Sequence, residues 1–197
     1  RQVSSAASDV YKRQISHRSL IIGSAVTGKI IVNNLLESED VLATANALRK
    51  MGVPINKLSN NKWEIFGSGI GSLSGTNNIL DMGNSGTGAR LLMGLVAGSD
   101  VEATFIGDQS LSKRPMKRII SPLIETGAII ENFNNDTLPI KIKGSKITLP
   151  IEYESTVASA QVKSSILLAG LSSIGTTSII EPSLSRDHTE RMLTVSY

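Results

Sequence analysis

Residues 47–53 read ALRKMGV and residues 122–128 read PLIETGA, so one pattern recurs 75 residues further along the chain. In both stretches an apolar helix ends at a glycine, the residue that helices favour directly after their last turn, and a strand residue follows. Two copies of this helix–glycine–strand pattern indicate internal repetition.

The sequence around these two stretches contains further helices and strands. Apolar residues at helical spacing predict helices over residues 15–26, 41–51, 90–96, 116–124 and 157–171, and another helix beginning at 191. We expect strands at 30–32, near 55, at 63–66, at 101–106 and at 176–180, and a kink in the fourth helix at Pro122. This order places the chain in the α/β or α+β class, with repeated units.

Composition excludes several kinds of protein. The 197 residues are 40% hydrophobic and 19% charged, which suits one domain or two small ones, and no apolar run is long enough for a membrane helix. The absence of cysteine excludes disulfides, thiolate zinc sites and a cysteine nucleophile. Twenty basic against 17 acidic residues, with only 4% aromatics, favours a few focused cations for a small anion over a nucleic-acid surface.

The first 14 residues differ in character from the rest. The chain begins with Arg1, its first methionine is Met51, and residues 1–14 have neither the apolar core of a secretion signal nor a clear periodicity. We therefore expect a non-native or disordered leader over 1–14 and a domain over 15–197.

Two motifs precede predicted helices and suit anions. In GNSGTGAR at 83–90, small residues lead into a helix whose free N–H groups can hold an anion, although a simple tight turn explains the glycines equally well. The run at 107–118, GDQSLSKRPMKR, holds four cations. We interpret Lys117 and Arg118 as a solvated face, whereas Lys113 and Arg114 oppose the helix dipole unless an anionic ligand lies beside them.

Two later polar stretches are ambiguous. Ser159 suits a helix N-cap as well as a ligand contact. His188 beside Asp187 suggests a base, but no Ser-His-Asp arrangement and no metal-ligand spacing accompanies it, so a charged, capped helix start is the simpler interpretation.

Taken together, five stretches resemble the 5-enolpyruvylshikimate-3-phosphate (EPSP) synthases, and they follow the order found in that family. They are ISHR at 15–18, GNSGTGAR at 83–90, GDQSLSKRPM at 107–116, SAQVKSSILLAGL at 159–171 and SRDHTERML at 185–193. The last two look most like the bacterial class that includes glyphosate-tolerant members. The resemblance implies βαβαββ units around a pseudo-threefold axis, and this chain would be the N-terminal one of the family's two domains, with the second absent.

The resemblance also implies an activity, a step of the shikimate pathway for aromatic amino acids. The enolpyruvyl group of phosphoenolpyruvate would pass to the 5-hydroxyl of shikimate 3-phosphate, releasing phosphate, without a metal or an organic cofactor. The family's catalytic acids belong to the second domain, so we expect no catalytic residue in this chain and no activity from it alone.

Site residues follow from the same motifs. Those implied for shikimate 3-phosphate are Arg18, Ser159, Ala160, Gln161 and Arg186, and those for phosphoenolpyruvate are Gly86, Arg114 and Gln161. Before ISHR the family has Pro-Gly-x-Lys-Ser, whose Lys contacts phosphoenolpyruvate and whose Ser contacts shikimate 3-phosphate. Here Arg13 and Gln14 stand at those two positions.

Several partner expectations complete the interpretation. We expect a cytoplasmic monomer that binds neither nucleic acid nor membrane, and a complete enzyme that glyphosate inhibits, because the tolerant members carry Ala at the position of Gly86. One alternative is a UDP-N-acetylglucosamine enolpyruvyl transferase, which commonly has a cysteine before the Arg-Pro that corresponds to Arg114-Pro115. The other alternative is a non-catalytic anion- or RNA-binding module built on residues 113–118.

Overall fold

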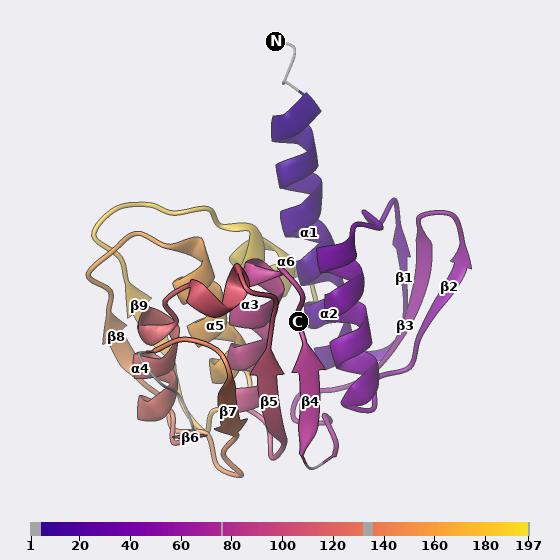
Figure 1. Cartoon of the computed structure of the whole chain (residues 1–197). Helices are drawn as coiled ribbons and strands as arrows, with labels where there is room; N and C mark the ends of the chain where they lie inside the picture. Colours follow the sequence, from indigo (N-terminus) through magenta and orange to yellow (C-terminus); the bar gives the residue numbers. More distant parts are fainter. Residues whose placement is uncertain (1–4, 76, 132–135, 197) are drawn as a thin grey trace.

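The computed structural model describes residues 5–75, 77–131 and 136–196, so residues 1–4 of the expected leader lie outside it. In Figure 1 the helices lie centrally, and sheets stand at the right, the front and the left of the view. No helix of the described ranges combines the length and the apolar character that crossing a membrane requires.

The middle of the chain forms a complete βαβαββ unit. Its elements are β4 (Asn78–Asp81), α3 (Gly86–Ala97), β5 (Glu102–Ile106), α4 (Lys117–Glu125), β6 (Ile129–Glu131) and β7 (Ile140–Lys143), with the 3-10 turn η1 (Leu111–Lys113) before α4. The strand order is β4-β5-β7-β6; β4 and β5 are parallel, and the other two pairings are antiparallel. The fold that the resemblance implies is therefore confirmed.

The sequences on either side follow the same plan. Before it lie α1 (Ser5–Ala25), β1 (Thr27–Asn33), α2 (Glu39–Lys50), β2 (Ile55–Ser59) and β3 (Lys62–Ser68), whose sheet order β1-β3-β2 matches β5-β7-β6. After it lie β8 (Glu152–Glu154), α5 (Ala160–Gly170), β9 (Ser178–Ile180) and α6 (His188–Ser196), and β8 pairs parallel with β9 as β4 does with β5.

The two stretches that reveal the repeat occupy equivalent places. Gly52 follows α2 with a φ of +88° and Gly127 follows α4 with a φ of +95°, a left-handed conformation that glycine adopts without strain. Each then leads into the hairpin of its unit, β2–β3 or β6–β7. The internal repetition inferred from the sequence is confirmed.

A single hydrophobic core draws on the helices and the sheets, and within it α3 packs against α5. Helix α3 is apolar on nearly every face, and ten of its twelve residues are buried, as expected of a helix enclosed by others. A Cβ atom at Gly94 would overlap the main chain of Ser165, and one at Gly98 would overlap that of Ala169. The two helices therefore meet backbone against backbone, which fixes their separation closely.

Helix boundaries lie within four residues of the sequence predictions, except at the start of α1. Helix α1 begins at Ser5 rather than at residue 15. The sequence does not predict this earlier start, because residues 8–14 are mostly polar and exposed and carry no apolar stripe. That residues 1–14 are foreign to the domain stays a prediction. Helix α4 begins at Lys117 and continues through Pro122 to Glu125; the expected kink there also stays a prediction.

Candidate functional site

Gly86 and Arg114, two predicted site residues, lie against each other. Ser85 caps α3 by accepting the N–H of Gly88 at 3.2 Å, so Gly86 opens the helix. The guanidinium of Arg114 crosses this turn: a Cβ atom at position 86 would stand 2.8 Å from its Nη1. A methyl group here would require the flexible end of Arg114 to shift, so the glycine leaves room for the guanidinium as well as starting the helix.

The start of α5 brings Gln161 to the same helix. Ser159 is the N-cap of α5 and accepts the N–H of Val162 at 3.4 Å. The side chain of Gln161 donates from Nε2 to the hydroxyl of Thr87 at 2.9 Å, and its Oε1 accepts a hydrogen bond from Arg90. Gln161 is thereby fixed between the first turns of α3 and α5.

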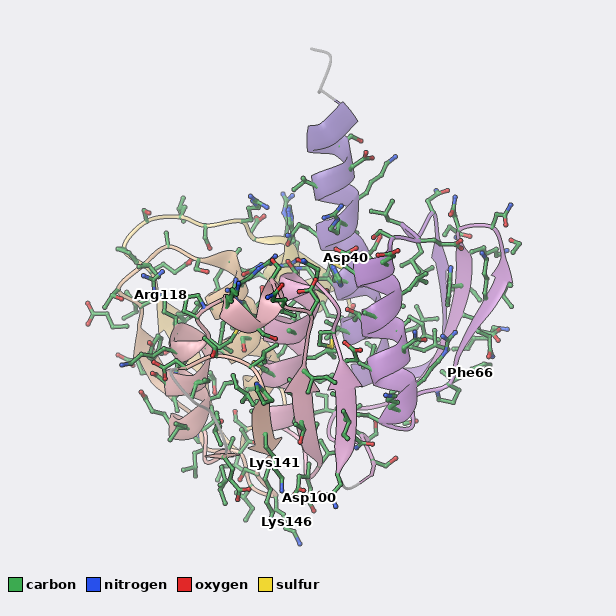
Figure 2. The ribbon with its side chains drawn as sticks, in the orientation of Figure 1. Asp40, Phe66, Asp100, Arg118, Lys141 and Lys146 are labelled. Atoms are coloured by element: carbon green, nitrogen blue, oxygen red, sulfur yellow. The ribbon has the colours of Figure 1, made fainter. Side chains whose placement is uncertain are left out.

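A hollow of about 410 Å³ lies beside Gln161. Its lining includes Arg90, Lys117, Arg118, Ser159 and Gln161, so the two cations interpreted as a solvated face are exposed but also border this space. Arg118 lies on the side of the molecule away from β1–β3 (Figure 2).

Asp136 also lines the hollow and lies 4.0 Å from Lys117, but the arginines near the hollow are not paired in this way. Burial, followed by the charges of Arg114 and Arg118, lowers the pKa of Arg90. Within residues 5–75, 77–131 and 136–196, no carboxylate forms an ion pair with Arg90, Arg114 or Arg118. Guanidinium groups that lie close together without a paired carboxylate suit a multiply charged anionic ligand.

Arg18 is buried, and its hydrogen bonds go to other parts of the protein. It donates from Nε to Thr189 at 2.8 Å, from Nη2 to Ser164 at 3.1 Å, and from Nη1 to the carbonyl and the side chain of Gln14 at 3.0 and 2.8 Å. Burial lowers the pKa of Arg18 to about 10, with Glu190 opposing and Arg186 adding to the effect. In this structure Arg18 ties α1 to α5 and α6, and its contact with shikimate 3-phosphate stays a prediction.

The two positions that depart from the family motif face different neighbours. Gln14 donates to Thr87 at 3.4 Å and so approaches the same hydroxyl as Gln161. Arg13 lies 3.3 Å from the carboxylate of Asp40 and, with it, borders a hollow of about 370 Å³ that also includes Asn84.

Ala160 and Arg186 complete the predicted set. Ala160 is the first residue of α5, and Arg186 is exposed in the segment before α6, close enough to lower the pKa of His188, for which burial and Arg18 are the larger causes. Helix α6 begins at His188, whose ring packs edge-on against Tyr11, so the interpretation as a helix start is confirmed.

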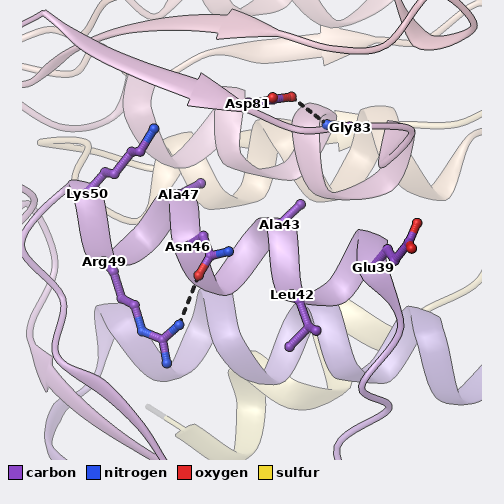
Figure 3. A pocket seen from close by; sticks show the side chains of 9 residues that line it. All are labelled: Glu39, Leu42, Ala43, Asn46, Ala47, Arg49, Lys50, Asp81 and Gly83. Atoms are coloured by element: carbon purple, nitrogen blue, oxygen red, sulfur yellow. Dashed lines mark hydrogen bonds between the residues drawn. The ribbon is translucent and has the colours of Figure 1, made fainter.

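A larger hollow, of about 680 Å³, lies between α2 and the end of β4 (Figure 3). Its two cations are already engaged, because Arg49 donates to Asn46 at 2.9 Å and Lys50 donates to the carbonyl of Ile79 at 2.8 Å. None of the predicted site residues lines it. Volume alone therefore does not locate the anion site.

Three residues of the site were quoted in a motif but given no role of their own. Asn84 accepts from Arg114, Thr87 joins Gln14 and Gln161, and Arg90 contacts Gln161. The sequence could have indicated two of them, because Thr87 and Arg90 are three residues apart and therefore lie on the same face of α3.

Comparisons with known proteins agree with this picture. The family model for EPSP synthase (3-phosphoshikimate 1-carboxyvinyltransferase) matches residues 10–195. The 3-phosphoshikimate 1-carboxyvinyltransferases of Parvibaculum lavamentivorans and Zymomonas mobilis are 52% and 54% identical over 181 residues, which is 92% of this chain and 40% of each relative. A solved EPSP synthase from Acinetobacter baumannii is 46% identical, with a TM-score of 0.87, over 92% of this chain and 41% of that one. The chain thus spans about two fifths of the length of these relatives.

Proposed function

The chain belongs to the EPSP synthase family, and on that premise we propose that it forms part of a 3-phosphoshikimate 1-carboxyvinyltransferase. The proposed reaction joins the 5-hydroxyl oxygen of shikimate 3-phosphate to C2 of phosphoenolpyruvate and eliminates inorganic phosphate. The observation that carries the proposal is the group of guanidinium ions at Arg90, Arg114 and Arg118, which lack carboxylate partners in the described ranges and lie near Gly86 and Gln161.

The chemistry of both substrates suits this group. Each substrate carries a phosphate and a carboxylate, and a planar guanidinium binds such groups through two parallel N–H donors. We propose that Arg114, Gly86, Gln161 and Arg13 contact phosphoenolpyruvate. The proposed contacts of shikimate 3-phosphate are Arg18, Ser159, Ala160, Gln161, Arg186 and Gln14.

The role of these residues is binding and orientation. Apart from the N–H of Val162, which Ser159 caps, the N–H groups of the first turn of α5 can hold a phosphate, as at other helix N-termini. Gln161, shared between the two substrates in this proposal, joins that turn to α3 through Thr87. Holding both substrates on one rigid pair of helices brings the attacking hydroxyl and C2 together, which lowers the entropic part of the barrier.

A chimera tests the activity. Residues 10–195 replace the aligned segment of the Zymomonas mobilis relative, and release of inorganic phosphate is measured with both substrates, together with growth of a synthase-deficient bacterium without aromatic amino acids. We expect turnover by the chimera and a loss of about 10- to 100-fold in kcat/KM on Arg114→Met, the scale of charged hydrogen bonds. A folded chimera that releases no phosphate, while the parent enzyme does, contradicts the proposal.

Three finer properties are proposed with it. Glyphosate inhibits the complete enzyme, because position 86 is a glycine and no methyl group stands beside Arg114, and inhibition of the chimera tests this. The protein is monomeric and cytoplasmic; size-exclusion chromatography with light scattering and fractionation of the source cells test these two points. A dimer, or recovery from the periplasmic or membrane fraction, contradicts them.

A further inference from the structure

Three side chains from separate loops form a chain of hydrogen bonds beside Gly86. Asn84 follows β4, Asp108 follows β5, and Arg114 follows η1. Because β4 and β5 are parallel neighbours, the loops after them meet at one edge of the sheet. Asn84 donates from Nδ2 to Asp108 Oδ2 at 2.8 Å, and its Oδ1 accepts a hydrogen bond from Nη2 of Arg114.

Asp108 is itself held in place by the main chain. Its Oδ1 accepts the N–H of Leu111 at 2.7 Å, and its own N–H donates to the carbonyl of Gly83 at 2.8 Å. The Leu111 N–H, followed by the amide of Asn84, holds the pKa of this carboxyl below its usual range. Asp108 is therefore ionised at neutral pH, and both of its oxygens only accept hydrogen bonds.

This restriction determines how the Asn84 amide is turned. An ionised carboxylate has no proton to give, so only the amino group of Asn84 can face Asp108. The amide oxygen must then face the opposite way, toward Arg114, which has only donors. In the reversed orientation, oxygen would face the carboxylate and the amino group would face the guanidinium, and both contacts would be repulsive.

The result is a guanidinium anchored at one end. Its Nη2 is bonded to Asn84, and its Nη1 lies over Gly86, where no acceptor among the described residues bonds it. We propose that Asp108 is a positioning residue: through the Asn84 amide it holds the Arg114 guanidinium over Gly86, with Nη1 directed to the anion. The identity of that anion as phosphoenolpyruvate rests on the proposed function, whereas the positioning itself does not.

Substitution of Asp108 by asparagine gives the sharpest consequence. In Asp108→Asn the oxygen stays with the Leu111 N–H, so the new amino group faces Asn84 and requires its oxygen. The Asn84 amide then reverses and presents donors to Arg114. Asp108→Glu retains a carboxylate and should keep the native orientation, and Asp100→Asn is the matched control, because Asp100 lies at the far end of the molecule (Figure 2).

The first test uses the 197-residue chain without any ligand. Nitrogen-15 NMR measures rotation about the Nε–Cζ bond of Arg114, whose signal is identified by its loss in Arg114→Lys. We expect rotation about 10-fold faster in Asp108→Asn, the factor equivalent to one hydrogen bond, and unchanged rotation in Asp100→Asn and Asp108→Glu. Equal rotation rates in Asp108→Asn and Asp100→Asn overturn the proposal.

The backbone amide NMR spectrum shows whether Asp108→Asn perturbs folding. If it does, a double-mutant cycle with Asn84→Ala still decides whether Asp108 acts on Arg114 through Asn84. Asn84→Ala removes the exposed amide, so Arg114 should rotate faster in that variant as well. Adding Asp108→Asn to Asn84→Ala should then change rotation much less than Asp108→Asn does alone, because the hydrogen-bonded route is cut and only the direct attraction between the two charges remains. A full additional effect in the double variant contradicts the proposed route.

The second test uses the chimera. Asp108→Asn should raise KM for phosphoenolpyruvate about 3- to 10-fold, again the scale of one hydrogen bond. KM for shikimate 3-phosphate should stay constant, and Asp108→Glu should restore the KM for phosphoenolpyruvate. Equal changes in both KM values indicate a general structural effect and contradict a positioning role. An inactive parent chimera contradicts the proposed function instead, and the NMR result still decides the positioning.

Discussion

Replacing Lys163 by methionine removes the centre of a buried charge cluster. The ammonium of Lys163 lies 2.9 Å from Glu181 and 2.6 Å from Glu190, and its side chain is 9% exposed. The second oxygen of each glutamate, Oε1 of Glu181 and Oε2 of Glu190, is buried without a hydrogen-bond partner. Lys163→Met therefore leaves two carboxylates side by side without the cation that pairs with both of them.

The expected cost follows from this burial. Removing one partner of a buried ion pair costs about 3–5 kcal/mol, and the 34% exposure of the Glu190 side chain places this case near the lower figure. For a chain of this size each kcal/mol lowers Tm by roughly 2–4 °C, so we expect a fall of about 6–12 °C. Lys146→Met is the control, because the Lys146 side chain is 82% exposed beside Asp100 and its loss should cost well under about 1 kcal/mol.

Urea unfolding followed by circular dichroism, at a series of pH values, measures both variants. In the wild type, hydrogen bonds from Lys163 and Ser185 outweigh the effect of burial and hold the pKa of Glu181 below its ordinary value of 4.5. That stabilisation is complete above pH 4.5 and is lost as the pH falls. The difference between wild type and Lys163→Met should therefore shrink in acid. A loss under about 1 kcal/mol at pH 7, or a difference that grows in acid, refutes the reasoning.

Three further predictions concern the site and its support. Gly86→Ala would bring a methyl group to 2.8 Å from Nη1 of Arg114. We expect the KM of the chimera for phosphoenolpyruvate to rise, while the free energy of unfolding changes by less than about 1 kcal/mol. An unchanged KM contradicts this. Arg18→Lys cannot reach the acceptors on three helices, so urea unfolding should report a loss of about 2 kcal/mol, and near-native stability would contradict the bonding described. Hydrogen bonds from His17 and Ser38 outweigh the effect of burial and hold the pKa of Asp40 well below 3.8. The free energy of unfolding should therefore fall less steeply below pH 3.8 in Asp40→Asn than in the wild type. Equal slopes for the two proteins in this pH range would contradict this.

The sequence predicts those features of the fold that a local physical rule determines. The helices ending at Gly52 and Gly127, and the glycine-rich start of α3, follow from apolar spacing and from the preference for glycine after a helix. The resemblance assigned Gly86 and Arg114 to one site, and in the structure the two residues lie against each other; that both bind phosphoenolpyruvate stays a prediction.

What sequence reasoning missed depends on tertiary contacts. Lys117 and Arg118 are exposed, as expected of a solvated face, but only the packing of α4 beside α5 shows that they border the same hollow as Ser159 and Gln161. The short strand β6 carries no alternation long enough to recognise from the sequence, and the helical character of residues 8–14 has no apolar stripe. The network around Arg18 joins residues more than 140 positions apart, and no local pattern predicts such pairs.

The backbone contact between α3 and α5 makes the site robust to mutation. Thr87 and Gln161, which belong to the proposed anion site, lie on two helices whose main chains meet at Gly94 and Gly98. Substitutions elsewhere in the core can therefore accumulate without altering the distance between the two helices, and the arrangement of the proposed site depends little on them. In libraries that randomise the core, the hydrogen bond between Thr87 and Gln161 should persist as long as those two glycines are held constant.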